Sequence, residues 1–156
     1  MESRISSFTP SNFHDFKEML STCFRDDYKI ELTHQQLELL AVEIVDRVYA
    51  GITDLGILFV DDAPCGFILY QIDNPKSDWC ERVGWGFIRE LYVDDGHKGQ
   101  GYGKELVSYA EQWFEVMSTP NIYLTSDDAG DFWESLGYKP TGELSKNNSL
   151  PVYVKK

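Results

Sequence analysis

The stretch LYVDDGHKGQGYGK, residues Leu91–Lys104, joins a strand-like apolar run to a helix-like run and holds four glycines within eight residues. A glycine inside a helix costs up to about 1 kcal/mol relative to alanine, so such a cluster needs a reason. Glycines let a backbone approach a ligand closely and leave the first N–H groups of the following helix free to bind an anion. His97, Lys98 and Lys104 add local positive charge. The stretch therefore predicts a pyrophosphate-binding turn.

Two common phosphate-binding motifs do not fit this stretch. A P-loop needs a glycine five residues before its Gly-Lys pair and Ser or Thr after it, but Lys98 and Glu105 stand there. A dinucleotide fingerprint needs a glycine three residues after Gly101, where Lys104 stands. A tight turn without a ligand is the remaining alternative, although such a turn needs one glycine rather than four.

The hydrophobic pattern on either side predicts a mixed α/β protein. Thr33 and Gln36 form a capping box at the start of one predicted helix, and Gly51 ends that helix. A chain of 156 residues without repeats or linkers predicts one domain over residues 1–156. Helices are expected at residues 10–24, 33–51, 99–117 and 129–136, and strands at 4–9, 54–60, 64–72, 85–93, 121–125, 138–144 and 150–154.

Two segments resemble one known family. Lys98–Gly103 is similar to the Arg/Gln-x-x-Gly-x-Gly/Ala signature of GCN5-related N-acetyltransferases, and Arg89–Val93 resembles the strand that precedes it. Residues 129–138, AGDFWESLGY, resemble that family's later segment, Ala-x-x-Phe-Tyr-x-x-x-Gly-Phe. The resemblance is specific over residues 88–142, while the first half agrees only in the order of its elements. It implies an α+β fold with a mixed, mostly antiparallel sheet of about seven strands and helices on both faces.

The resemblance also implies acetyl-CoA as the acetyl donor. Backbone groups of Leu91 and Val93 would pair with the pantetheine arm, and amides of the glycine loop would hold the pyrophosphate. The thioester would lie where the strands at 85–93 and 121–125 separate. Ser126 stands about where many members carry an asparagine that contacts the cofactor. The implied cofactor-binding residues are Leu91, Tyr92, Val93, His97, Lys98, Gly99, Gln100, Gly101, Tyr102, Gly103, Lys104, Ser126 and Phe132.

Transfer to an amine needs a base, since only a neutral amine attacks, and an acid for the departing thiolate. Glu90 is the first candidate for the base, and a salt bridge with Arg89 is the alternative role. Tyr138 and Tyr92 are candidate acids or core residues. Trp133 occupies the position of the family's usual acidic tyrosine, and its indole cannot supply a proton at neutral pH. A non-catalytic acyl-CoA-binding regulatory module is therefore the alternative function.

The acceptor is expected to bind between residues 25–32 and 73–81. Asp27 and Asp73, with Asp26 and Asp78, would bind a cationic amine, and Tyr28 and Trp79 would stack on it; solvated acidic loops are the alternative. A net charge of −12 disfavours nucleic acid as a partner and favours cationic small molecules or protein amines. Exposed strand edges make a homodimer a further expectation.

The remaining features concern location and metals. No apolar run approaches the roughly 20 residues that a membrane span needs, and the first 16 residues lack the apolar core of a signal peptide. These features predict a cytoplasmic protein without a membrane partner. Cys23, Cys65 and Cys80 form no CxxC pair and have no nearby histidine cluster, so no metal site is expected.

Overall fold

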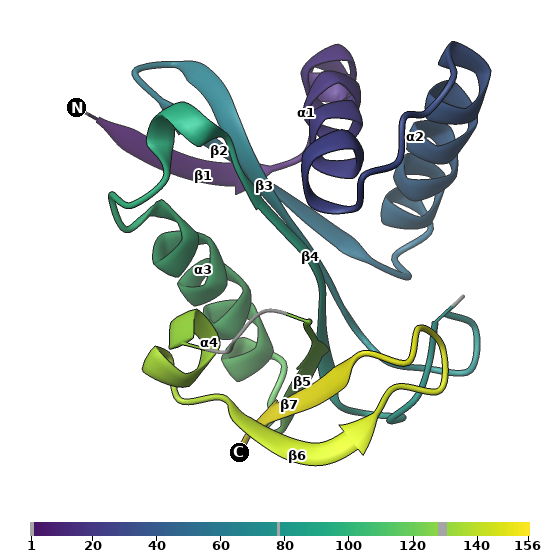
Figure 1. Ribbon diagram of the computed structural model, residues 1–156, viewed down its shortest axis with the longest axis vertical. Helices are drawn as coiled ribbons and strands as arrows, with labels where there is room; N and C mark the ends of the chain where they lie inside the picture. Colours follow the sequence, from purple (N-terminus) through teal and green to yellow (C-terminus); the bar gives the residue numbers. More distant parts are fainter. Residues whose placement is uncertain (1, 78, 128–130) are drawn as a thin grey trace.

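The computed structural model describes residues 2–77, 79–127 and 131–156. One seven-stranded sheet carries helices on both of its faces (Figure 1). The elements, in chain order, are β1 (Ser3–Ser7), η1 (Pro10–Asn12), α1 (Phe13–Asp27), α2 (His34–Tyr49), β2 (Asp54–Val60), β3 (Ala63–Ile72), β4 (Gly86–Val93), η2 (Asp95–His97), α3 (Tyr102–Val116), β5 (Ile122–Thr125), α4 (Asp131–Ser135), β6 (Lys139–Leu144) and β7 (Pro151–Lys155).

The sheet has the order β1-β2-β3-β4-β5-β7-β6, and every neighbouring pair except β4–β5 is antiparallel. The parallel pair β4–β5 is short, with only Gly86 opposite Ile122 and Phe87 opposite Tyr123. Beyond these residues the two strands separate. This arrangement confirms the expected mixed, mostly antiparallel sheet, and β1 and β6 form its two edges. Assembly into a homodimer stays a prediction.

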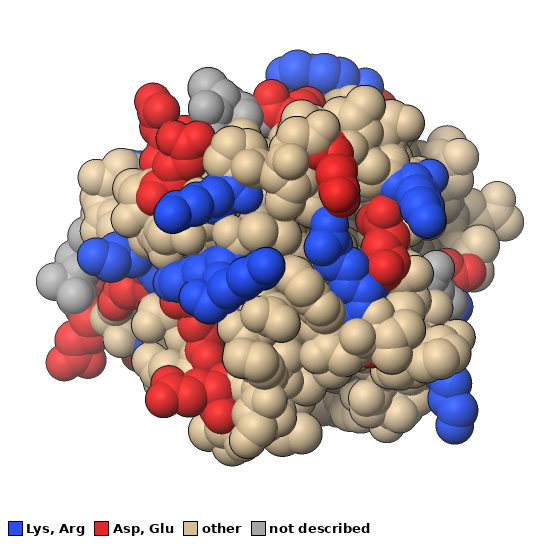
Figure 2. All heavy atoms as spheres, turned by 90° about the horizontal axis from the view of Figure 1, so that it is seen from below, with Lys and Arg blue, Asp and Glu red and all other residues tan. Residues whose placement is uncertain are grey.

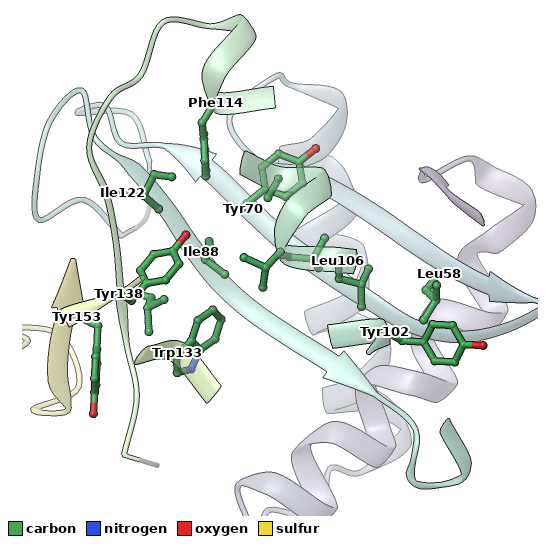
Figure 3. Close-up of a cluster of buried hydrophobic side chains, with 14 of the residues drawn as sticks. Leu58, Tyr70, Ile88, Tyr102, Leu106, Phe114, Ile122, Trp133, Tyr138 and Tyr153 are labelled. Carbon is green, nitrogen blue, oxygen red and sulfur yellow. The ribbon is translucent and has the colours of Figure 1, made fainter. Parts of the chain in front are cut away.

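Two hydrophobic clusters lie on opposite faces of the sheet. On one face α1 and α2 pack against β2 and β3. On the other face α3 and α4 pack against β3, β4 and β5 (Figure 3). Phe16 from α1 and Phe114 from α3 are fully buried, one in each cluster. The sheet is therefore covered by helices on both sides. Strands β4 and β5, which separate beyond Phe87, lie between the two helical layers.

A bulge in β4 changes which side chains face each side. Leu69 lies opposite Glu90 whereas Tyr70 lies opposite Ile88, so Arg89 is the extra residue in β4. Ile88 and Leu91 consequently both pack into the cluster of α3. Regular alternation would place two residues three apart on opposite faces. The bulge therefore leaves Glu90 on the side of α1 and α2.

Most predicted elements agree with the structure, but two helices have different boundaries and one side chain expected to be buried is exposed. The helix expected at 10–24 begins as the 3-10 turn η1 and then continues as α1 to Asp27. The helix expected from Gly99 begins at Tyr102, because Gly99 and Gly101 have φ of +77° and +88°. Met117, expected on the buried face of this helix, is 51% exposed at the C-terminal cap.

Two further findings concern the charges on the surface and the helices. Basic and acidic side chains are interspersed on the face shown in Figure 2, so neither sign dominates it. In the part of the chain that the structure describes, no helix combines the length and the apolar character required to cross a lipid bilayer.

Candidate active site

A cavity of about 570 Å³, here called the loop cavity, lies where β4 passes through the glycine-rich turn into α3. It contains most of the residues predicted to bind the cofactor. Asp27, Ser135 and Leu136 complete its wall. The predicted residues that line it are Leu91, Tyr92, Val93, His97, Lys98, Gly99, Gly101, Tyr102, Gly103, Lys104 and Phe132.

The N-terminus of α3 differs from that of α2. The α2 helix is capped by Thr33, whose side chain accepts a hydrogen bond from the Gln36 amide. The α3 helix has Gly101 at its N-cap position, and among the described residues no side chain caps it. Its first N–H groups thus keep the capacity to bind an anion, assisted by the helix dipole. The glycine loop has the backbone geometry that a pyrophosphate requires.

The strand β4 offers a second set of backbone groups to the loop cavity. One edge of β4 pairs with β3 up to Val93. Along the other edge, β5 pairs only with Gly86 and Phe87, so within the described residues Ile88–Val93 has no strand partner on that side. An extended ligand could add to this edge as a further strand does. This edge fits the arm of coenzyme A as the sequence resemblance implied.

Phe132 covers the loop from α4. Its ring is 41% exposed and lines the loop cavity. A Cβ atom at Gly103 would stand 3.2 Å from Cζ of this ring, so glycine permits the close approach of α3 and α4. Two predicted cofactor residues lie elsewhere. Gln100 does not line the loop cavity and points its amide towards the Gly96 carbonyl, 3.4 Å away, while Ser126 lines the neighbouring cavity.

Two of the basic side chains of the loop lie beside acidic neighbours. His97 Nδ1 lies 2.6 Å from Asp94 Oδ1, and Lys98 Nζ lies 3.0 Å from Asp95 Oδ1. These pairs reduce the positive charge that the sequence suggested, so amides and the helix dipole become the main attraction for an anion. The pairing orients the His97 ring through Nδ1.

The same turn brings three potential metal ligands together. Ligand atoms of Cys65, Asp94 and His97 lie within 4.8 Å of one another. Two ligands of one tetrahedral zinc ion, each about 2.1 Å from it, stand about 3.4 Å apart. The 2.6 Å between His97 and Asp94 is instead a hydrogen-bond distance. No sequence pattern indicated this convergence, because Cys65 lies on β3, about 30 residues before the loop.

Glu90 lies in a second cavity of about 460 Å³, the junction cavity, where β4 and β5 separate. Its Oε2 accepts a hydrogen bond of 2.5 Å from the Tyr28 hydroxyl, and Cys23 Sγ lies 3.8 Å from its Oε1. Burial raises the pKa of Glu90 from its ordinary 4.5 to about 7; the Tyr28 hydrogen bond opposes this shift, and the charge of Asp27 adds to it. Glu90 is thus a half-buried carboxylate suited to proton transfer near neutral pH.

The structure also shows what two neighbours of Glu90, Arg89 and Cys23, contact. Arg89 donates to Gln71 Oε1 at 3.3 Å, on the neighbouring strand β3. Cys23 was not predicted in the site. Burial, together with the carboxylates of Glu90 and Asp27, raises the pKa of its thiol, which therefore stays protonated. Its position on the inner face of α1 resembles that of any core cysteine, so the sequence carried no signal for this contact.

The junction cavity connects the glycine loop to Glu90. It shares Asp27, Leu91 and Phe132 with the loop cavity, and Ser126 and Trp133 also line it. Of the predicted acceptor residues, Asp27 and Tyr28 border it, as does Asp26. The predicted donor-binding and acceptor-binding groups from the two halves of the chain are therefore adjacent.

Tyr138 does not reach this site. Its side chain is fully buried, and its hydroxyl donates to Glu111 Oε2 at 2.8 Å. Figure 3 shows the rings of Tyr138 and Trp133 turned towards Ile88 in the core. The proposal that Tyr138 is an acid is corrected on this ground, because α3 holds its hydroxyl away from the junction cavity. Tyr92 is also a core residue, stacked on Phe67 at 5.6 Å.

Asp73 is a structural residue rather than an acceptor ligand. It is 1% exposed, and its carboxylate accepts hydrogen bonds from the Tyr123 hydroxyl, Gln71 Nε2 and the amides of Glu81 and Arg82. This buried carboxylate has its partners inside the fold and orders the loop before β4. The prediction that it binds the acceptor is therefore wrong.

Another predicted acceptor residue, Trp79, belongs to the same loop. Trp79 donates through Nε1 to Glu81 at 3.1 Å and packs on Phe87. It does not line the junction cavity, but it borders another cavity on the α1–α2 side. Asp78 lies outside the described residues.

Comparisons with known proteins agree with this geometry. Residues 13–138 match the model of the Acetyltransferase (GNAT) family. An uncharacterized N-acetyltransferase of Bacillus velezensis is 28% identical over 103 residues, which span 64% of this chain and 61% of that protein. The whole activity of that longer relative therefore does not transfer by similarity alone.

Two solved structures share the fold over nearly the whole chain. PaiA N-acetyltransferase from Thermoplasma acidophilum, in complex with coenzyme A, has a TM-score of 0.75 at 16% identity, covering 100% of this chain and 99% of that one. An acetyltransferase of the GNAT family from Staphylococcus aureus has a TM-score of 0.77 at 14% identity, covering 99% and 98%. At such identities the likeness shows the fold.

Proposed function

The chain belongs to the acetyltransferase (GNAT) family, and on that premise we propose that it transfers an acetyl group from acetyl-CoA to a primary amine. The observation that carries the proposal is the continuity of two cavities. The loop cavity, with its uncapped helix and open strand edge, joins the junction cavity that contains Glu90. A donor held by the loop therefore extends towards a carboxylate that is suited to accept a proton.

In this proposal, backbone groups of the glycine loop and of β4 bind the donor. Amides of Lys98, Gly99, Gly101 and Gly103 hold the pyrophosphate, and Leu91 and Val93 hold the arm. Acetyl-CoA supplies an acetyl group activated as a thioester. These assignments are supported by the cavity that the same residues line.

Glu90 carries the proton transfer. An alkylammonium ion, like that of lysine, has a pKa of about 10.4 and must lose a proton before it attacks. Glu90 takes this proton, and the neutral amine nitrogen forms a bond to the thioester carbonyl carbon. The nitrogen then loses a second proton to water as the carbon–sulfur bond breaks and releases the thiolate. Because the Trp133 indole does not donate a proton at neutral pH, water in the junction cavity protonates the thiolate. Cys23 is not acylated, since its thiol stays protonated beside two carboxylates.

Thiol release from acetyl-CoA in the presence of a panel of primary amines tests the proposal. We expect one CoA released for each amine acetylated. Thermal stabilisation by CoA is measured alongside, and at 100 times its dissociation constant the ligand should add about 2.7 kcal/mol. Stabilisation without turnover of any amine would contradict the proposal and favour an acyl-CoA-binding regulatory module. Absence of both would indicate a domain that no longer binds the donor.

A further inference from the structure

A third cavity of about 350 Å³, here called the apolar cavity, lies between the α1–α2 layer and the sheet. Ligand sites commonly occupy about 300–1,000 Å³ and are mainly apolar with a few polar groups. The apolar cavity has this character. Its apolar side chains come from both helices, from strands β3 and β4 and from three loops, and they include Phe24, Ile30, Leu40, Ile44, Trp79 and Leu150.

All of the polar residues that line the apolar cavity except Asn148 lie where it meets the junction cavity. Tyr28, Arg89, Glu90 and Thr125 line both cavities. The three cavities therefore follow one another across the strand separation, from the glycine loop through Glu90 to the apolar wall. An acceptor whose nitrogen lies at Glu90, opposite the donor, has its remaining atoms in the apolar cavity.

The charges restrict what this part of the acceptor can be. Among the described residues that line the apolar cavity, Glu90 is the only carboxylate and Arg89 the only cation. A second ammonium group placed there would lose water without gaining a counter-ion. We propose that the acceptor is a monoamine whose nitrogen carries one apolar substituent, about as large as a benzene ring with a short linker. This substituent binds in the apolar cavity. This inference rests on the proposed function and narrows the acceptor, which the acidic composition limited only to cationic small molecules or protein amines.

The size of the cavity sets the expected effect. An apolar cavity of about 150 Å³ is enough to bind benzene, so 350 Å³ accommodates a ring and a short linker. Each methylene transferred from water to an apolar site changes affinity about fourfold. We therefore expect kcat/KM for 2-phenylethylamine to exceed that for ethylamine by at least about a hundredfold, and spermidine to be no better than ethylamine.

Two substitutions in α2 test whether the apolar substituent of the acceptor binds in the apolar cavity. Leu40 lines the apolar cavity, whereas the adjacent Leu39 is 63% exposed and does not line it. Leu40→Trp should fill the cavity and lower kcat/KM for 2-phenylethylamine at least tenfold, with ethylamine and the KM for acetyl-CoA nearly unchanged. Leu39→Trp is the matched control and should change none of these. Thermal midpoints and CoA stabilisation confirm that both variants fold.

A substitution at Ile30 tests the same binding site without adding volume to the core. Ile30 lines the apolar cavity from an exposed loop and is 48% exposed, so Ile30→Ser should fold normally. It should raise KM for 2-phenylethylamine several-fold and leave ethylamine unchanged. Calorimetric titration of 2-phenylethylamine into the protein with CoA bound should show the same weakening without requiring turnover.

The outcomes separate this inference from the proposed function. Acetylation of spermidine in preference to 2-phenylethylamine, or equal use of 2-phenylethylamine and ethylamine, overturns the inference and leaves the acetyltransferase assignment standing. Equal effects of Leu40→Trp and Leu39→Trp also overturn it. If CoA binds and no amine reacts, the proposed function fails, and the inference fails with it.

Discussion

The donor side and the acceptor side of the strand separation are built in different ways. The proposed donor side is mostly one continuous segment, Leu91–Lys104, whose backbone amides and strand edge line the loop cavity. The acceptor side joins side chains that are distant in sequence, such as Tyr28 and Glu90, which are 62 residues apart. A ligand common to a whole family can be held by backbone, while a ligand specific to one protein needs side chains. We therefore expect substitutions on the two sides to change different kinetic constants.

The largest expected effect comes from Glu90→Gln, which removes the base and retains the shape of the side chain. We expect kcat/KM for the amine to fall about 10²–10⁴-fold, the usual contribution of general base catalysis. KM for acetyl-CoA should stay within about twofold, because Glu90 does not line the loop cavity. Steady-state kinetics with both substrates varied measures the two effects. A large change in acetyl-CoA affinity would contradict the division between the two sides.

The same variant should be more stable than the parent protein at alkaline pH. The folded state raises the pKa of Glu90 from 4.5 to about 7, so folding disfavours its charged form. This destabilisation is absent below pH 4.5, grows between 4.5 and 7, and is complete above 7, where it reaches up to about 3 kcal/mol. Glu90→Gln removes it. Thermal midpoints should therefore rise in the variant at pH 8 and differ little at pH 4.5.

On the donor side, Gly99→Ala should weaken acetyl-CoA binding about tenfold. Gly99 has a φ of +77°, where an L-residue costs about 1–2 kcal/mol, and relief of this strain would move the amides that face the pyrophosphate. Gly51→Ala is the matched control, since Gly51 has a φ of +75° and neither site has an atom within 4 Å of an added Cβ. Both variants should lose similar stability, measured by denaturant unfolding, and only Gly99→Ala should raise KM for acetyl-CoA. Equal KM values would argue against a pyrophosphate at this loop.

Tyr28→Phe should shift the pH dependence of the acceptor side. The Tyr28 hydrogen bond lowers the pKa of Glu90, so its removal raises that pKa above the parent value of about 7. A base must be ionised to act, so the acidic limb of kcat/KM should move to higher pH, with a loss of about three- to tenfold at pH 7 that recovers near pH 9. Tyr49→Phe, at a tyrosine that is 59% exposed on α2, should leave the profile unchanged. A loss that is constant with pH would mean that Tyr28 acts on something other than Glu90.

The two sides also differ in how much of each could be predicted from the sequence. The glycine loop is local: spacing, backbone freedom and the following helix are all contained in one stretch, and the loop cavity lies among the residues predicted for it. The seven strands were likewise recognisable from hydrophobic runs and turn residues. Gln100 was misplaced because the motif gives the spacing of amides but not the direction of the side chain between two of them.

The acceptor side was predicted less well, because it depends on tertiary packing. The bulge at Arg89 decides which face Glu90 occupies, and nothing in residues 85–93 indicates it. Asp73 was assigned to the acceptor because it lies in a polar loop, but it is buried, and its carboxylate accepts hydrogen bonds from four donors in β3, in β5 and in the same loop. Such contacts join residues up to 50 positions apart, so a reading of local pattern does not reveal them.

Trp133 provides the smallest expected effect and a test of the boundary between the two sides. It is 8% exposed, lines the junction cavity and packs on the Phe132 ring at 4.9 Å. Trp133→Tyr places a phenol, which can donate a proton, where the indole cannot. We expect kcat to rise about two- to fivefold, and Trp133→Phe, which matches tyrosine in shape without the hydroxyl, to show no rise. If both variants behave alike, the thiolate proton does not limit turnover, and water in the junction cavity supplies it fast enough for the tryptophan to be tolerated.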